Sequence, residues 1–143
     1  MKLKRVTTQE ELVYARSIHD LLFEAETWDP NQAKAVWLVW NNSEPVGFCS
    51  IDETDMAPEA AFVSYIGLLA SARGRGLGRR MVRTCTKWAR DAGYSRIVSY
   101  TWVENVSSAR SFLREGWEYF YPENTASGYI WFEKKLDPPS ILQ

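Results

Sequence analysis

Residues 73–79 read RGRGLGR, so that glycines alternate with basic and apolar residues. Glycine lets the backbone turn tightly and leaves the amide groups uncovered. Apolar residues recur at helical spacing from Leu77 onward, which indicates that the glycines open a helix. The first turn of a helix has unpaired N–H groups and a positive dipole end, and both suit an anion. Because no acid occurs between Glu59 and Asp91, the stretch predicts a binding site for a phosphate group.

Two other phosphate-binding motifs do not fit this stretch. The dinucleotide fingerprint G-x-G-x-x-G has a spacing that G-R-G-L-G lacks, and it needs an acid about 20 residues later. The P-loop needs a lysine and a hydroxyl residue directly after its last glycine, and no such pair follows Gly78.

The elements around the loop alternate between strand and helix patterns. Thr8 and Glu11 form a capping box at a helix start, and Gly93 is a natural C-cap after the basic helix. The predicted strands cover residues 2–6, 35–40, 46–51, 61–69, 96–102, 117–121 and 129–135. A helix follows the capping box and restarts before the turn at 28–30, a second follows the glycines, and a third covers 105–115. The order β-α-α-β-β-β-α-β-α-β-β predicts an α/β fold, a mixed sheet with helices on both faces.

Length and composition fit a single globular domain over residues 1–143, with an irregular tail at 137–143. The chain is 45% hydrophobic and 24% charged, and no apolar run reaches the roughly 18–20 residues that a membrane span needs. The N-terminus has no apolar signal core, so we expect a cytoplasmic protein that does not bind a membrane. Cys49 and Cys85 show no metal-ligand spacing, and we expect buried reduced thiols and no metal.

The net charge of −1 hides an uneven distribution. Residues 1–59 carry 11 acids against 5 bases, a charge of −6, and residues 60–143 carry 7 acids against 12 bases, a charge of +5. One interpretation is two solvated faces of different composition. The other is that one half meets an anionic ligand and the other half a cationic one.

A second motif lies downstream, and with it the chain resembles the GNAT N-acetyltransferase superfamily. The acyl-CoA loop of that family follows [Q/R]-x-x-G-x-[G/A], which Arg73, Gly76 and Gly78 match. Its later helix follows N-x-x-[S/A]-x-x-x-[Y/F]-x-x-x-G-[F/W], which is matched in register by Asn105, Ser108, Phe112, Gly116 and Trp117. The segment 131–136 also looks like the last strand of the family. The resemblance covers nearly the whole chain.

The resemblance implies acetyl-CoA, or another short acyl-CoA, as co-substrate. It implies that the amides of residues 73–79 hold the pyrophosphate and that the backbone of residues 68–70 holds the pantetheine arm. The coenzyme-binding residues would be Leu68, Leu69, Ala70, Arg73, Gly74, Arg75, Gly76, Leu77, Gly78, Arg79, Asn105, Ser108 and Phe112. The remaining bases of the helix, Arg80, Arg83, Lys87 and Arg90, are expected to form a solvated face.

In the usual scheme of the family, the amine attacks the thioester directly in a ternary complex. A backbone N–H at Leu68 or Leu69 would then stabilise the oxyanion. Phe112 stands where the family commonly has a tyrosine that protonates the leaving sulfur, and the substitutes are water, Ser108 or Tyr119. The predicted base is Glu59, with residues 52, 53 and 55 and a simple water chain as alternatives.

The acceptor would be a small-molecule or peptide amine. The residues predicted to contact it are Glu24, Trp28 and His19, although a surface or structural role is open for the histidine and a core role for the tryptophan. Two other functions stay open: an acyl-CoA-binding module with little or no activity, and a nucleic-acid role for the basic helix, which the acidic residues 1–59 disfavour. A homodimer is common in the family.

Overall fold

The computed structural model describes residues 1–123 and 125–137, which form a mixed α/β fold. The strands are β1 (Lys2–Arg5), β2 (Ala35–Asn41), β3 (Glu44–Asp52), β4 (Ala61–Leu68), β5 (Arg96–Trp102), β6 (Glu118–Phe120) and β7 (Tyr129–Lys135). They follow the order β1-β2-β3-β4-β5-β7-β6 in one sheet, in which β4 and β5 are parallel. The predicted fold class is confirmed, and each predicted strand agrees with the structure to within two residues at either end.

The described residues also form three α-helices: α1 (Gln9–Leu22), α2 (Leu77–Asp91) and α3 (Val106–Arg114). Two 3₁₀ turns, η1 (Pro30–Gln32) and η2 (Ala70–Ala72), stand at chain reversals. The second helical element, predicted to restart before Trp28, is the single turn η1 directly after Asp29. Asp29 caps this turn by accepting a hydrogen bond from the Asn31 amide, which explains why the helical turn begins there.

The described chain divides into two compact units, and it passes between them after Asp52, inside β4 and inside α2. Unit 1 comprises residues 1–52 and 64–81, and unit 2 comprises residues 53–63 and the described residues from 82 onward. The prediction of one domain over residues 1–143 stays a prediction. Of the predicted tail, only Asp137 is among the described residues.

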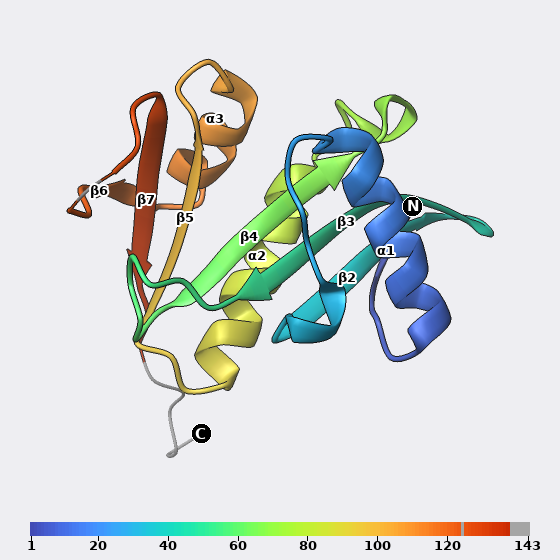
Figure 1. Cartoon of the computed structure of the whole chain (residues 1–143), viewed down its shortest axis with the longest axis horizontal. Helices are drawn as coiled ribbons and strands as arrows, with labels where there is room; N and C mark the ends of the chain where they lie inside the picture. The colour runs from blue at the N-terminus through green and yellow to red at the C-terminus, as the bar shows by residue number, and fades with distance from the viewer. Residues whose placement is uncertain (124, 138–143) are drawn as a thin grey trace. The chain divides into compact units, whose positions relative to one another are not determined.

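In unit 1, α1 packs on the face formed by β2 and β3 (Figure 1). Thr8 caps the helix, and Glu11 reaches back to the Thr8 amide, so the predicted capping box is confirmed. The core beneath the helix includes Ala15, Ile18 and Phe48. Cys49 is buried and free, as predicted. This packing fixes the end of α1 over the strands that carry the candidate site.

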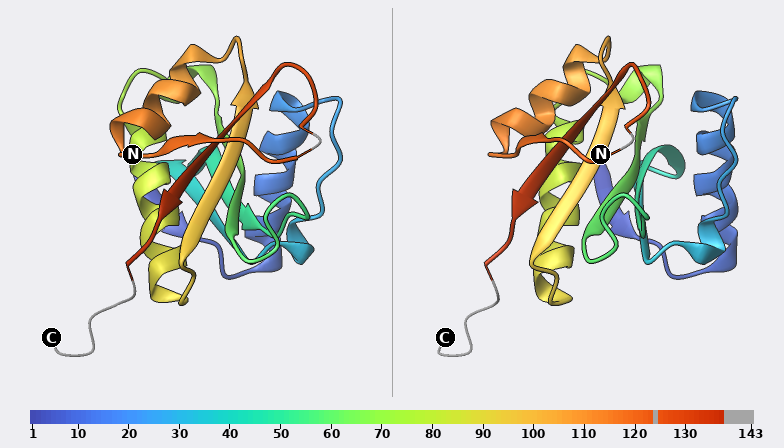
Figure 2. Two further views of the ribbon diagram at one scale, coloured as in Figure 1. Left: turned by 90° about the vertical axis from the view of Figure 1, so that its left-hand side faces the viewer. Right: turned by 60° about the vertical axis from the view of Figure 1, so that its left-hand side comes forward.

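In unit 2, β5 pairs with β7 along its whole length, and α3 lies beside them (Figure 2). Phe112 of α3 packs against Trp117 and Phe132, with ring centroids 4.7 Å and 5.3 Å away. Cys85 of α2 is also buried and free. Gly93 ends α2 with a φ of 92°, and the next amide, that of Tyr94, donates to the Ala89 carbonyl, as expected for the predicted C-cap.

Across the described part of the chain, no helix combines the length and apolar character needed to cross a membrane.

Candidate functional site

The glycine loop lies beyond the carboxyl end of β4, where it leads into α2 (lime in Figure 1). Gly74 and Gly76 have φ values of 75° and 76°, a region that other residues rarely adopt. A Cβ atom built on either glycine would meet no atom within 4 Å, so the space above the loop is open. The loop is exposed from Arg73 to Gly76, and the first turn of α2 contains no acid. This geometry suits an anion at the start of α2.

Two arginines brace this loop against its own backbone. The Arg73 Nε donates a hydrogen bond to the Leu68 carbonyl oxygen at 3.1 Å, and the Arg75 Nε donates to the Ser71 carbonyl at 3.4 Å. Through these bonds the loop is tied to the last residue of β4 and to η2. Such bonds pre-organise the amides without occupying them.

Two of the four later bases on α2 form ion pairs in unit 2. The Arg83 guanidinium pairs with Glu115, and the Lys87 ammonium lies 2.7 Å from Asp91 on the same helix. The side chains of Arg83 and Lys87 are 62% and 76% exposed, and the expectation of a solvated helix face stays a prediction.

The amides of Leu68 and Leu69, the two predicted oxyanion donors, point to opposite edges of β4. The Leu69 amide donates to the Val46 carbonyl at 2.8 Å, so it points toward β3. Successive residues in a strand direct their N–H groups to opposite edges, and the Leu68 amide therefore points away from β3. The pairing of β4 with β5 covers Ala61–Val63, upstream of this point. Of the two, Leu68 is the residue whose amide suits an acyl oxygen.

The alternation of side chains along β4 is interrupted at Ser64 and Tyr65. The Ser64 hydroxyl lies 2.6 Å from the Ser50 hydroxyl, and the Tyr65 ring lies 6.1 Å from the Phe48 ring. Phe48 and Ser50 are two residues apart on β3 and share one face. Two consecutive residues of β4 therefore point to the same face, as at a β-bulge. The interruption follows directly after the residues that pair with β5.

A carboxylate is held at this interruption. Asp52 is the last residue of β3, one position beyond the predicted end of this strand at residue 51, and the Ser64 hydroxyl donates to its Oδ2. The pKa of Asp52 lies above its usual value because burial disfavours the carboxylate. The Ser64 hydroxyl and the Trp28 indole both lower this pKa and so offset part of the effect of burial. The indole N–H does so without a hydrogen bond of normal length to a described residue. A carboxyl group in such surroundings keeps its proton to a higher pH than an exposed aspartate does, which is a property of many catalytic acids and bases.

The predicted acceptor residues fall into two groups. His19 is fully buried and Trp28 is 8% exposed, and their rings stack in a cluster with Phe23, Phe48 and Tyr65. The His19 Nδ1 lies 2.9 Å from Asp20, and its Nε2 has no hydrogen-bond partner among the described residues. Glu24 is exposed after the end of α1. Roles of these residues in acceptor binding stay predictions, and the burial of both rings fits the alternatives of a structural histidine and a core tryptophan.

The other predicted site residues lie in unit 2. Asn105 caps α3 by accepting a hydrogen bond from the Ser108 amide at 3.1 Å, so both residues of the second motif shape the helix start. Phe112 is buried among aromatic rings and is 3% exposed, whereas Tyr119, whose ring lies near that of Phe132, is 52% exposed. The catalytic and coenzyme-binding roles of these residues stay predictions.

Glu59, the predicted base, forms an ion pair with Arg96, which also pairs with Glu133 at 2.6 Å. The pKa of Glu59 lies below its usual value, because its own backbone amide and the Arg96 guanidinium favour the carboxylate. A depressed pKa makes a carboxylate a weaker base. The pair of Glu59 with Arg96 was not predicted from the sequence, because it depends on the pairing of β4 with β5, in which Ala61 lies opposite Ile97.

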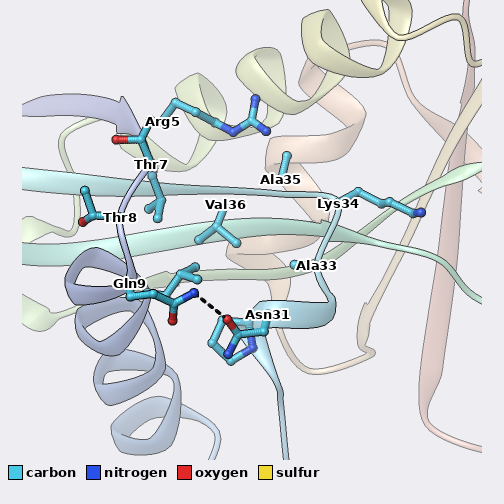
Figure 3. A pocket seen from close by; sticks show the side chains of 12 residues that line it. Arg5, Thr7, Thr8, Gln9, Asn31, Ala33, Lys34, Ala35 and Val36 are labelled. Atoms are coloured by element: carbon cyan, nitrogen blue, oxygen red, sulfur yellow. Dashed lines mark hydrogen bonds between the residues drawn. The ribbon is translucent and has the colours of Figure 1, made fainter.

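A separate surface cavity of about 330 Å³ lies where the start of α1, η1 and the start of β2 meet (Figure 3). Its lining is mostly polar, and a hydrogen bond of 2.9 Å from Gln9 to Asn31 closes one side (Figure 3). The start of α1 is at the end of the helix away from the glycine loop (Figure 1). None of the predicted site residues lines this cavity.

The geometry of the loop and of β4 can now be compared with known proteins. The sequence model of the acetyltransferase (GNAT) family matches residues 5–117. The chain belongs to this family. A curated relative, mycothiol acetyltransferase from Corynebacterium glutamicum, is 26% identical over 113 residues, which are 79% of this chain and 36% of the relative. The chain thus spans about a third of the length of that relative.

Solved structures show the same fold. Ribosomal-protein-alanine N-acetyltransferase from Brucella melitensis aligns with a TM-score of 0.76 at 15% identity, over 95% of this chain and all of the other. An acetyltransferase from Bacillus subtilis in complex with CoA aligns with a TM-score of 0.66 at 14% identity, over 94% of this chain and 98% of the other. At these identities the likeness concerns the fold alone.

Proposed function

We propose that this GNAT-family chain transfers an acetyl group from acetyl-CoA to a primary amine, by direct attack of the amine on the thioester. The observation that carries the proposal is the open glycine loop at the start of α2. Its two positive-φ glycines leave free space, and no acid stands in the first helical turn. The B. subtilis relative, solved with CoA, supports the same class of coenzyme.

The chain supplies a seat for the diphosphate and an edge for the pantetheine arm. The amides of residues 73–79 would hold the diphosphate, because the first N–H groups of a helix have no partner within the helix. The free edge of β4 would hydrogen-bond the extended arm through backbone groups. We also propose that Asn105, Ser108 and Phe112 contact the coenzyme, as the second motif predicts.

The Leu68 amide would stabilise the oxyanion that forms when the amine attacks. It points away from β3, whereas the Leu69 amide is engaged by Val46. One such donor contributes on the order of 10²–10³ to the rate. The sulfur leaves as a thiolate with a pKa of roughly 8.5, which needs little help from an acid, so Phe112 does not prevent turnover.

The names of the relatives do not select an acceptor for this chain. One relative is named for mycothiol and another for an alanine of a ribosomal protein. A small-molecule amine and a peptide amine therefore both belong to the proposal.

The test has two stages. Calorimetry should show that acetyl-CoA binds to the purified protein, and CoA thiol release should then be followed with spermidine, kanamycin, L-lysine and an alanine-terminated peptide. Thiol release that depends on one of these amines supports the proposed function. Tight binding of acetyl-CoA without release for any amine would contradict it.

A further inference from the structure

The pairing of β4 with β5 determines where the pantetheine arm of the coenzyme would end along β4. An arm that hydrogen-bonds to the free edge of β4 starts near the glycine loop, beyond Leu68, and runs toward the start of the strand. It must stop where β5 occupies the same edge, and that pairing covers Ala61–Val63. The reacting end of the arm therefore lies between Leu68, whose amide would hold the thioester oxygen, and Ser64, where the alternation of side chains is interrupted.

Asp52 and Ser64 stand at this place in unit 1. The Ser64 hydroxyl donates a hydrogen bond to the Asp52 Oδ2, and the Ser50 hydroxyl lies 2.6 Å from the Ser64 hydroxyl. A hydroxyl has one proton, so while Ser64 donates to the carboxylate, Ser50 must donate to Ser64. Ser50 is fully buried, and the chain of hydroxyls ends there instead of reaching solvent. The chain thus orients the carboxylate of Asp52, which itself stays partly exposed.

We propose that Asp52, oriented by Ser64, is the base that accepts a proton from the acceptor ammonium. This inference rests on the proposed function. The ammonium R–NH₃⁺ gives one proton to the Asp52 carboxylate and becomes R–NH₂. The nitrogen lone pair then forms a bond to the thioester carbon, the carbon–sulfur bond breaks, and the sulfur leaves with its electron pair. A second nitrogen proton reaches the sulfur, which gives CoA–SH and the amide, and Asp52 releases its proton to water.

The surroundings of Asp52 support this role over the other acids. Its pKa is raised by burial and lowered by Ser64 and Trp28, all of which are uncharged influences. The ionisable residues on the neighbouring elements include Lys34 before β2, His19 on α1, Tyr65 on β4, and Glu53, which follows Asp52. None of these contributes to the shift. Glu59, by contrast, is neutralised by Arg96 and has a lowered pKa.

The experiment compares three variants with the unmodified chain, using the amine from the panel that gives the fastest thiol release at saturating acetyl-CoA. Asp52→Asn keeps the shape of the side chain and an oxygen that can accept from Ser64, but it cannot take up a proton. Ser64→Ala keeps the carboxylate and removes the hydrogen bond that lowers its pKa. Glu44→Gln is the matched control, an exposed acid at the other end of the same strand.

We expect Asp52→Asn to lower kcat on the order of 10²-fold and to lose the rise of kcat with pH, with acetyl-CoA affinity unchanged by calorimetry. Ser64→Ala should keep kcat at high pH but move this rise to higher pH, since its carboxyl group holds the proton more tightly. Glu44→Gln should behave like the unmodified chain. A purely structural role for Asp52 would not move the pH profile of Ser64→Ala.

Two results would overturn the inference, and they can be distinguished because only one of them also contradicts the proposed function. Turnover by Asp52→Asn with an unchanged pH profile removes Asp52 as the base and leaves the proposed function intact. Failure of the unmodified chain with every amine removes the proposed function and this inference with it. If Asp52→Asn does not fold, the direction of the Ser64→Ala shift decides, and no shift or a downward shift counts against Asp52.

Discussion

The Arg73 Nε donates a hydrogen bond to the Leu68 carbonyl oxygen at 3.1 Å, so the first residue of the glycine loop holds the last residue of β4. This bond connects the predicted diphosphate seat to the predicted oxyanion donor. A change in the loop should consequently reach the strand edge, although no ligand contact is altered directly.

Arg73→Lys tests this connection, because lysine keeps the positive charge and lacks the Nε donor. A hydrogen bond from a charged donor contributes about 1.5–3 kcal/mol, so we expect acetyl-CoA affinity to fall roughly tenfold. Calorimetry measures this loss. Arg90→Lys on α2, outside the loop, is the control and should bind acetyl-CoA like the unmodified chain.

Gly76→Ala should weaken both folding and coenzyme binding. The residue has a φ of 76°, a conformation that costs an L-residue about 1–2 kcal/mol. Gly93→Ala is a matched control, because Gly93 has a φ of 92° and equally open surroundings but lies at the C-terminus of α2. Urea unfolding should show a similar loss of stability for both variants, and calorimetry should show weaker acetyl-CoA binding for Gly76→Ala alone. Equal affinities would show that the amides of the loop do not hold the diphosphate.

Phe112→Tyr should destabilise the chain without a large gain in rate. The ring is 3% exposed between Trp117 and Phe132, and a hydroxyl placed there without a partner costs about 1–3 kcal/mol. Thermal unfolding measures the first effect and thiol release the second. A rise in kcat of tenfold or more would instead place the new hydroxyl at the leaving sulfur and revive the idea of a binding module that has lost its acid.

The stability of α1 should depend on the ionisation of Glu11. The pKa of this carboxyl lies below its reference value of 4.5, mainly because the Thr7 amide donates to it. A lowered pKa in the folded state means that the stabilisation is complete above pH 4.5 and is lost as the pH falls through the folded value. Glu11→Gln keeps the capping geometry and should unfold with less dependence on acid in this window. Parallel acid titrations followed by circular dichroism would contradict the prediction if the two curves coincide.

The features that local sequence determines were predicted well. The capping box at Thr8, the C-cap at Gly93 and the glycine loop depend on residues within one or two helical turns, and the two family motifs depend on spacing alone. The interruption at Ser64–Tyr65 was not predicted, because it becomes visible only when the neighbours of each side chain on β3 are known. The same holds for Asp52, which reads as an acidic loop residue and lies at a strand end against Ser64. The full burial of His19 depends on rings from three other elements.

The interruption of side-chain alternation in β4 also limits which insertions and deletions this strand can tolerate. Loss of one residue between Ser64 and Leu68 would turn the side chains on one side of the deletion to the opposite face, because side-chain direction in a strand has a period of two. Where this moves Gly67 from its place, its bulky neighbours Leu22 and Phe48 would meet a larger side chain. Natural insertions and deletions should therefore accumulate in the loop at 53–60 and be rare within the second half of β4.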